Sequence, residues 1–446
     1  MKHWLHSALA TLPLSLAAPL HAADQFPANH APTGYLQVLP SDPDARNALA
    51  SAPQINIAQQ QRLLGEAQAR QQADGAHEWV LSSTVQQRKE VLAGVKYQEE
   101  DVSLTRAFRW LGKAGLDQSL GEQISATAGY AFEDAWHEAG RSLLSNWFDW
   151  LRASSEARLL TQQLALFEAQ LAATEKRVQA GDAPRIETQL ALAELARAQA
   201  AQTRAQQNAD LLALSLHSAF PTLELRLPTQ LDVPQALIED DERWIRLVVD
   251  NNHEIELAQG EADVAKLAAQ RAKRDRIADP SIGVHYGRER DAQERIVGVT
   301  FSIPLPGAAR QNAYQSAQAD ALRRQRMVEQ IQLKVERDAH ADVLAMHSTF
   351  KQWQLLASLA EQAQRNADIV ARAYALGEFG LSETQLARRQ ALDSAIAAQT
   401  AQLDALQAQA RLWLDAHQLW ALDHNHEHPG STRQAGTNSQ AMSGTE

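Results

Sequence analysis

The chain contains one ten-residue pattern twice. Residues 181–190 read GDAPRIETQL and residues 377–386 read GEFGLSETQL, so both copies place a Gly, an acidic residue and a Glu-Thr-Gln-Leu run at the same spacing. A second matching pair, residues 53–59 and 253–259, lies 200 positions apart, compared with 196 for the Gly patterns. Such repetition has to be recognised before local structure is assigned, because each copy is one structural unit. The sequence therefore predicts two copies of one unit that differ slightly in length.

The domain boundaries follow from this repeat and from the two ends of the chain. Residues 1–22 are expected to be a secretory signal peptide, because a basic start precedes a short apolar run and small residues near Ala22. The alternative is a transmembrane anchor, but that would need a longer apolar run of ~20 residues. The first repeat is expected over 23–234, the second over 235–422, and a disordered tail over 423–446.

Composition excludes several classes of protein. The formal net charge is -12 and no long basic tract occurs, so nucleic acid is not an expected partner. There is no Cys, hence no disulfide and no N-terminal Cys for a lipid anchor. No segment after the signal peptide has the length and lack of charge of a membrane-spanning helix, so strands are the expected way to cross a membrane. An enzyme and a cofactor are not expected, since no Gly-rich phosphate loop, nucleophile elbow or His-Glu-x-x-His motif occurs.

Two long intervals without Pro predict very long helices. No Pro occurs between Pro53 and Pro184 or between Pro306 and Pro429, and both intervals are rich in Ala, Gln, Leu and Arg. Helices of ~60 residues would be ~90 Å long. Their many Ala residues would let neighbouring helices approach closely. A fibrous coiled coil is the simplest alternative.

Each half also contains a hairpin pattern with a period of two, which a fibrous coiled coil does not explain. In the second half it covers about 281–303, around a charged loop from Arg288 to Arg295. Small or polar residues alternate there with the apolar side chains of Ile282, Val284, Tyr286, Val297, Val299, Phe301 and Ile303. This alternation is typical of membrane strands with one face on lipid and one on water. Half-buried strands of a soluble α+β domain are an alternative, because period two alone does not identify a membrane barrel.

The first half repeats the hairpin pattern less clearly over about 79–108. After a loop rich in Lys and Glu, Arg106 falls on the same face as the apolar residues. That face comprises Trp79, Leu81, Ser83, Val85, Val102, Leu104 and Phe108. A charge at mid-bilayer depth costs ~2–4 kcal/mol. We therefore expect either that Arg106 lies near the membrane interface or that this strand has a different register.

Four strands cannot close a barrel, and open strand edges are not tolerated in lipid. Three chains would supply twelve strands, an acceptable even number. The ordered duplication, with DPSIGV at 279–284 leading into the third strand and SIPLP at 302–306 leaving the fourth, resembles the TolC-like outer-membrane efflux proteins over about 40–420. Within that family the sequence resembles the cobalt-zinc-cadmium efflux channels most.

The resemblance implies a mixed α/β membrane protein built from a duplicated helix–β-hairpin–long helix–turn–helix unit. It implies a homotrimer with a twelve-stranded barrel in the outer membrane and an α-helical coiled-coil tunnel in the periplasm. The implied partners are outer-membrane lipid, a periplasmic adaptor and an inner-membrane RND-type pump. The expected function is a passive exit channel for divalent heavy-metal cations. One alternative is the same channel for drugs, small organic molecules or secreted polypeptides, and another is a pore-less periplasmic adaptor or rod.

The repeated Gly turns are the implied inner tips of the tunnel. There the family meets its adaptor, so the resemblance assigns adaptor contacts to Gly181, Asp182, Gly377 and Glu378. Family members also carry an acidic residue six positions after each turn Gly.

Glu187 and Glu383 occupy those acidic positions. Around a three-fold axis such carboxylates would form a ring that attracts cations. A capping role at a helix start is the alternative, equally favoured for Glu187 and less favoured for Glu383. Tyr374 matches a family position that constricts the tunnel mouth, although it could equally pack between helices. Phe379 stands where the family has an Arg, which argues against a gate locked by an Arg-centred ion network.

Two further groups of residues invite a ligand. His424, His426 and His428 alternate in the tail and could chelate a divalent metal ion, or could be incidental residues of a disordered tail. The aromatic residues Trp147, Phe148 and Trp150 could form a stacking platform, but packing between helices or at a membrane interface is the favoured interpretation.

Overall fold

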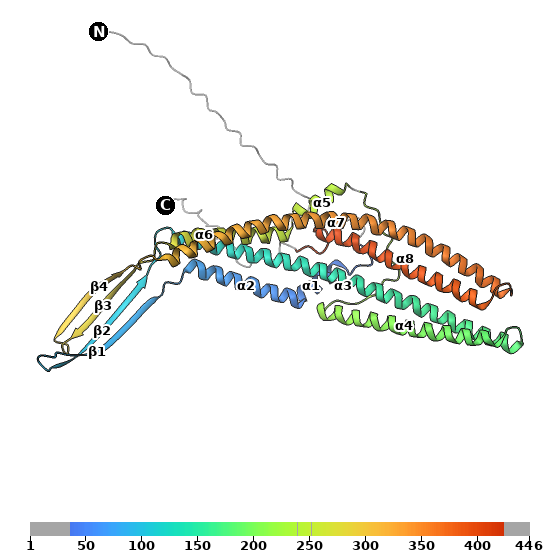
Figure 1. Cartoon of the computed structure of the whole chain (residues 1–446), viewed down its shortest axis with the longest axis horizontal. Coiled ribbons are helices and arrows are strands. Elements are labelled where there is room, and N and C mark those ends of the chain that lie inside the picture. Colours follow the sequence, from blue (N-terminus) through green and yellow to red (C-terminus); the bar gives the residue numbers. More distant parts are fainter. Residues whose placement is uncertain (1–35, 239, 251, 423–446) are drawn as a thin grey trace, which may run out of the picture. The chain divides into compact units, whose positions relative to one another are not determined.

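The computed structural model describes residues 36–238, 240–250 and 252–422 (Figure 1). The predicted signal peptide, residues 1–22, and the predicted tail with His424, His426 and His428 lie outside the described residues.

The predicted duplication is confirmed by the order of the elements. The first half contains α1 (Asp42–Ser51), α2 (Pro53–Asp74), β1 (Trp79–Lys89), β2 (Lys96–Ala107), α3 (Lys113–Ala180) and α4 (Arg185–Ala219). The second half contains α5 (Asp241–Asp250), α6 (His253–Asp275), β3 (Ser281–Glu289), β4 (Glu294–Ser302), α7 (Ala308–Ala375) and α8 (Leu381–Asp415). Both α3 and α7 have 68 residues, and both α4 and α8 have 35.

The small length difference between the halves arises mostly in the β-hairpins. Residues 75–112 connect α2 to α3, whereas residues 276–307 connect α6 to α7, so the second connection is six residues shorter. The turn between α7 and α8 is one residue longer than the turn between α3 and α4. Because α6 is also one residue longer than α2, the three differences together give the change in spacing from 200 to 196.

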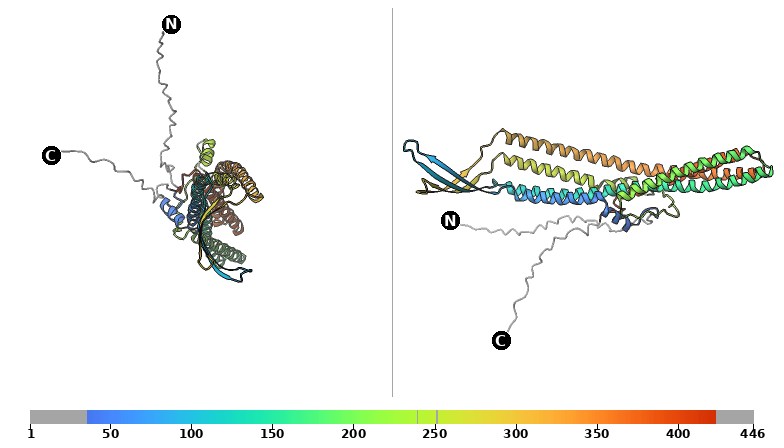
Figure 2. Two further views of the ribbon diagram at one scale, coloured as in Figure 1. Left: turned by 90° about the vertical axis from the view of Figure 1, so that its left-hand side faces the viewer. Right: turned by 90° about the horizontal axis from the view of Figure 1, so that it is seen from below.

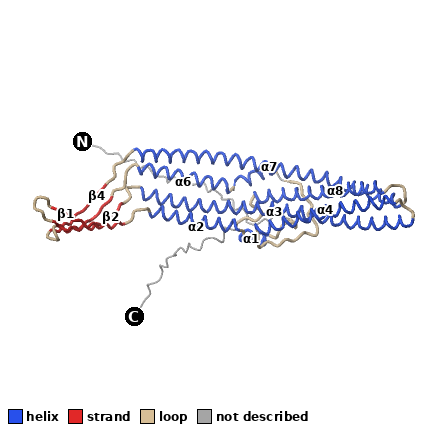
Figure 3. Tube along the Cα trace, turned by 60° about the horizontal axis from the view of Figure 1, so that its bottom comes forward, coloured by secondary structure: helices blue, strands red, loops and turns tan. Residues whose placement is uncertain are grey.

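Long helices run side by side, with the strands at one end and the two helix-to-helix turns at the other (Figures 2 and 3). Helix α3 packs against α2, α4, α6 and α8, and α7 packs against α6 and α8. Small side chains sit where α3 meets α4, as the Ala content predicts; they are Ala153, Ala157, Ala205 and Ala209. None of the helices described here combines the length with the apolar character that crossing a membrane requires.

The largest hydrophobic core surrounds the middle of α3. Trp147, Phe148 and Trp150 are all buried in it. The indole of Trp147 donates a hydrogen bond to the carbonyl oxygen of Val38 at 2.8 Å and packs 5.0 Å from the ring of Trp150. This confirms the interpretation that these aromatic residues pack between helices, and no stacking platform is left open on them.

The four strands form one antiparallel sheet in the order β1-β2-β3-β4. Its register places the predicted apolar residues of both hairpins on a single face, which we call the apolar face. Its members are Trp79, Leu81, Val85, Val102, Leu104, Ile282, Val284, Tyr286, Val297, Val299 and Phe301. All of them are exposed in the single chain, with Leu81 at 72% and Val297 at 81%.

The opposite face carries small and polar residues that fit around glycines. Gly283 lies between Thr105 on β2 and Thr300 on β4. A Cβ atom at Gly283 would come within 2.2 Å of the Thr105 side chain, and one at Gly298 would come within 2.1 Å of the His285 ring. These glycines therefore make room for polar side chains on this face.

Arg106 keeps the predicted register and lies at the end of β2 nearest the helices. Its guanidinium group lies 5.4 Å from the ring centroid of Trp79 and donates a hydrogen bond to the carbonyl oxygen of His77 at 3.2 Å. The strand register is therefore not shifted, and Arg106 instead lies at the edge of the apolar face.

The strands are longer than the apolar pattern indicates. Half of the expected loop from Arg288 to Arg295 is strand, because β3 continues to Glu289 and β4 begins at Glu294. Charged residues continue the pairing there, and Arg88 on β1 forms ion pairs with Glu99 at 3.0 Å and Glu289 at 3.3 Å. Backbone pairing does not depend on apolar side chains, so it extends past the last of them.

Candidate functional site

The repeated glycines end the two longest helices in the same way. Gly181 and Gly377 have φ angles of 81° and 80°, the left-handed region in which other residues are strained. The backbone N–H of Gly181 donates to the carbonyl of Val178, and that of Asp182 donates to Arg177. The same two bonds recur from Gly377 and Glu378 to the carbonyls of α7. Both turns are therefore Schellman motifs, which explains why the sequence repeats a Gly there.

Replacing Gly377 by Ala is expected to loosen the turn by ~1–2 kcal/mol, because Ala is strained in the left-handed region. The space around the residue is not limiting, since no atom lies within 4 Å of an added Cβ. Amide hydrogens in the turn should exchange roughly 5–30 times faster in the variant. Gly115 in α3 is the matched control, because it is equally uncrowded and has no positive φ. Equal exchange in G377A and G115A would contradict this explanation.

Both predicted tip acids occupy the third position of a helix, but their surroundings differ. Glu187 is half-buried and accepts a hydrogen bond from the Tyr374 hydroxyl at 3.1 Å, which joins α4 to α7. Glu383 is exposed, and its carboxylate folds back so that a Cβ on Gly380 would lie 2.5 Å from it. Pro184 is the N-cap of α4. Both acids are favourably placed for the helix dipole.

Tyr374 is both a packed residue and a polar link. Only 8% of it is exposed, and it packs with Ala191 and Leu381. The guanidinium of Arg177 lies 4.7 Å from its ring centroid. Burial and the hydrogen bond to Glu187 raise the pKa of its hydroxyl, which stays a donor at neutral pH.

Arginine contacts at the tips come from residues that the sequence did not single out. Phe379, at the position where an Arg was expected from the resemblance, is exposed. Arg388 donates a hydrogen bond to the side-chain oxygen of Gln170 at 3.0 Å, which joins α8 to α3. Arg389 lies 3.5 Å from Glu194 and joins α8 to α4. In the sequence, only their distance from the turn glycines could have drawn attention to Arg388 and Arg389. Each lies about two hundred positions from the residue that it contacts.

A buried carboxylate cluster, also missed at the sequence level, lies where α3, α7 and α8 meet. His137, Arg141 and Arg411 all contact Asp415, at 3.0, 2.9 and 2.6 Å. Burial opposes its ionisation, but these three groups hold the pKa of Asp415 below its usual range. Asp342 shares a hydrogen bond with Asp415. Burial and the Asp415 carboxylate raise the pKa of Asp342 to about 7, although the positive charges of Arg411 and Arg141 act to lower it.

Asp342 is therefore expected to make stability depend on pH. At pH values between 3.8, the ordinary pKa of Asp, and about 7, Asp342 keeps a proton in the folded chain and loses it in the unfolded chain. The free energy of unfolding contributed by Asp342 should thus fall as pH rises through this range. D342N, which stays neutral, should have a higher Tm than the wild type at pH 8 and a similar Tm at pH 5. Asp338, whose side chain is 46% exposed, supplies the control, and a pH-independent difference for D342N would contradict the assignment.

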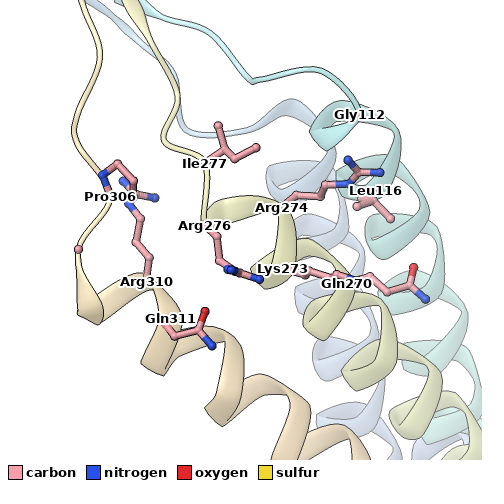
Figure 4. Close-up of a pocket in the computed structure, with 11 residues that line it drawn as sticks. Gly112, Leu116, Gln270, Lys273, Arg274, Arg276, Ile277, Pro306, Arg310 and Gln311 are labelled. Atoms are coloured by element: carbon pink, nitrogen blue, oxygen red, sulfur yellow. The ribbon is translucent and has the colours of Figure 1, made fainter.

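A basic cavity of about 810 Å³ lies where the helices join the strands (Figure 4). It is lined by the ends of α3, α6 and α7 and by four cationic side chains: Lys273, Arg274, Arg276 and Arg310. Arg310 donates to the carbonyl oxygen of Asp275 at 2.8 Å, and Arg276 lies 5.9 Å from the Tyr314 ring centroid. Its charge suits an anionic group.

The overall arrangement matches that of known outer-membrane channels. The Campylobacter jejuni CmeC outer membrane channel superposes with a TM-score of 0.72 and 13% identity, over 86% of this chain and 87% of that one. A CusC structure matches with a TM-score of 0.72 and 12% identity, over 88% and 95%. The open state of the Neisseria gonorrhoeae MtrE outer membrane channel matches with a TM-score of 0.68 and 15% identity, over 85% and 89%.

The chain therefore has the fold of the TolC-like outer-membrane channels. No protein-family model matches the sequence, and neither does any curated protein. The shared fold does not single out a heavy-metal subgroup.

Proposed function

We propose that the chain is the outer-membrane exit channel of a tripartite efflux pump. The apolar face of the sheet is the observation that carries this proposal. It is contiguous over four strands and exposed, and an exposed apolar surface of this kind marks contact with a membrane or another protein. The alternation of an apolar face with a small, polar face is the arrangement of a membrane barrel. A pore-less periplasmic rod leaves such a face without a role.

The channel is a homotrimer closed through the edges of the sheet. Within one chain β1 and β4 are edge strands. Lipid does not tolerate unpaired strand edges. Pairing β4 of one copy with β1 of the next closes a barrel of twelve strands after three copies. The long helices then form a tunnel on the periplasmic side, and residues 1–22 act as the export signal for two repeats over 23–234 and 235–422.

The two helix tips contact a periplasmic adaptor, which links the channel to an inner-membrane RND-type pump. Gly181, Asp182, Gly377 and Glu378 form the two turns of this contact. Exposed apolar side chains beside the turns support it, since they would be covered in a complex; they are Ile186, Leu376 and Phe379.

The tunnel mouth is gated by Tyr374, Glu187 and Glu383. The Tyr374–Glu187 hydrogen bond holds the tip of one repeat to the tip of the other. Glu383 is exposed and supplies the negative ring. Releasing the hydrogen bond lets the two helical hairpins separate, which widens the mouth.

Divalent heavy-metal cations are the proposed cargo. Support comes from the tip carboxylates and from His424, His426 and His428, whose imidazoles suit borderline metal ions. Drugs or other organic molecules are the second candidate, because the shared fold does not by itself select a cargo.

Conductance in planar bilayers tests the channel. Detergent-purified trimers should give discrete pores, and E383A should reduce their preference for cations over anions. A protein that stays soluble without detergent and forms no pores would favour the rod. Cargo is tested separately: cells lacking the chain should accumulate zinc or cobalt, and accumulation of an organic dye alone would favour the second candidate.

A further inference from the structure

Three histidines from distant parts of the sequence meet beside two glutamates in the middle of the helical region. His137 comes from α3, His253 begins α6, and His417 follows α8. Their ring centroids are 4.7 Å apart for His253 and His417, 5.1 Å for His137 and His417, and 6.0 Å for His137 and His253. This cluster is far from both helix tips and has no part in the proposed gate.

The geometry around His253 resembles a metal site before the ion binds. Its Nδ1 lies 3.2 Å from a carboxylate oxygen of Glu256 and 3.8 Å from one of Glu133. One ligand atom from each of these residues lies within 4.8 Å of the others. Around a tetrahedral ion with bonds of ~2.1 Å, ligand atoms lie ~3.4 Å apart. The observed distances bracket that value, so small side-chain movements would complete three bonds.

The fixed backbone brings the ligands to one place. His253 and Glu256 are three residues apart on α6, which puts them on the same helix face. His417 has a φ of 57°, in the left-handed region that favours glycine. Its backbone N–H donates to the carbonyl of Leu414 and that of Gln418 donates to Trp413, as in the tip turns. A histidine therefore occupies the position where those turns have glycine, and its ring packs on His253.

Two neighbouring groups border this cluster. Nε2 of His137 lies 3.0 Å from Asp415, which holds the His137 ring beside the rings of His253 and His417. One carboxylate oxygen of Asp134 is buried and has no hydrogen-bond partner among the described residues. The surroundings thus contain a buried carboxylate oxygen to which no described residue donates a hydrogen bond.

We propose that Glu133, His253 and Glu256, with His417 as the fourth ligand, bind a resident divalent transition-metal ion such as Zn²⁺. Imidazole and carboxylate together suit this class of ion. The ion would join α3 of the first repeat to α6 of the second and to the end of α8. It is a structural clamp, distinct from any cargo ion that passes through the tunnel, and it does not depend on the proposed transport function.

Cobalt titration tests the site, because Co²⁺ bound by nitrogen and oxygen ligands absorbs visible light. The full chain should carry H424A, H426A and H428A, so that the tail does not compete for the ion. We expect one Co²⁺ per chain, displaced by Zn²⁺ and not by Mg²⁺, and a higher Tm with Zn²⁺ present.

Variants locate the ion. H253A should abolish the visible absorption, and E256Q, at an exposed position, should weaken binding at least about tenfold. H347A is the matched control, because His347 pairs with Asp241 at 2.8 Å elsewhere on the surface. If H253A does not give a trimer with normal circular dichroism, E256Q decides alone. Absence of a stoichiometric ion, or equal binding by E256Q and H347A, would overturn the proposal.

Discussion

Replacing Val284 by Arg is expected to prevent the chain from assembling in the outer membrane. Val284 is 55% exposed near the centre of the apolar face, paired with Leu104 on one side and Val299 on the other. An Arg at mid-bilayer depth on the lipid face of a barrel costs ~2–4 kcal/mol. A trimer incurs this cost three times. The amount of trimer recovered from outer-membrane fractions measures the effect.

Thr84 provides the matched control on the other face of the same sheet. It is exposed on β1 and pairs with Asp101, so T84R places the same charge where water and a carboxylate are available. T84R trimers should reach the outer membrane in normal amounts. Equal losses in V284R and T84R would show that the apolar face does not contact lipid.

Replacing Tyr374 by Phe is expected to open the tunnel mouth. The substitution keeps the ring that packs under Arg177 and removes the one hydroxyl that donates to Glu187. A hydrogen bond to a charged group contributes ~1.5–3 kcal/mol, and Glu187 would be left half-buried without this donor. Three copies lose the bond at once. Single-channel recordings should show a severalfold higher conductance or longer open times.

Tyr314 is the control for this experiment, because it lies on the same helix near the strands and 5.9 Å from Arg276. Y314F should conduct like the wild type. If Y374F also conducts like the wild type, the hydrogen bond is not a latch and Tyr374 is only a packing residue.

The sequence predicts the elements well where a pattern repeats over many residues. Pro-free runs and period-two alternation indicate the long helices and all four strands, and the two Gly patterns place both tip turns. The strand ends are predicted less well, since Arg288 and Glu294 continue the ladder without apolar side chains. The alternation of apolar and polar residues predicts which face of a strand each side chain lies on. The length of the strand depends on backbone hydrogen bonding, which does not require apolar side chains.

The contacts of the site are beyond sequence patterns for a different reason. Tyr374 and Glu187 are 187 positions apart, and His137 and Asp415 are 278 apart. Each residue looks like an ordinary polar residue on a helix until the helices are packed. The sequence places Glu187 and Glu383 at matching positions of the two repeats, whereas the structure gives them different surroundings. Glu187 accepts a hydrogen bond from Tyr374 of the other repeat, and Glu383 is exposed.

In the proposed trimer, the unequal hairpins would give the two ends different symmetry. Helices of matched length would present six nearly equivalent tips at the inner end. At the outer end, strands of 11 and 12 residues alternate with strands of 9 and 9. The rim would therefore rise and fall three times per circuit, and a phage protein or antibody approaching from outside would meet three tall lobes in place of a level ring.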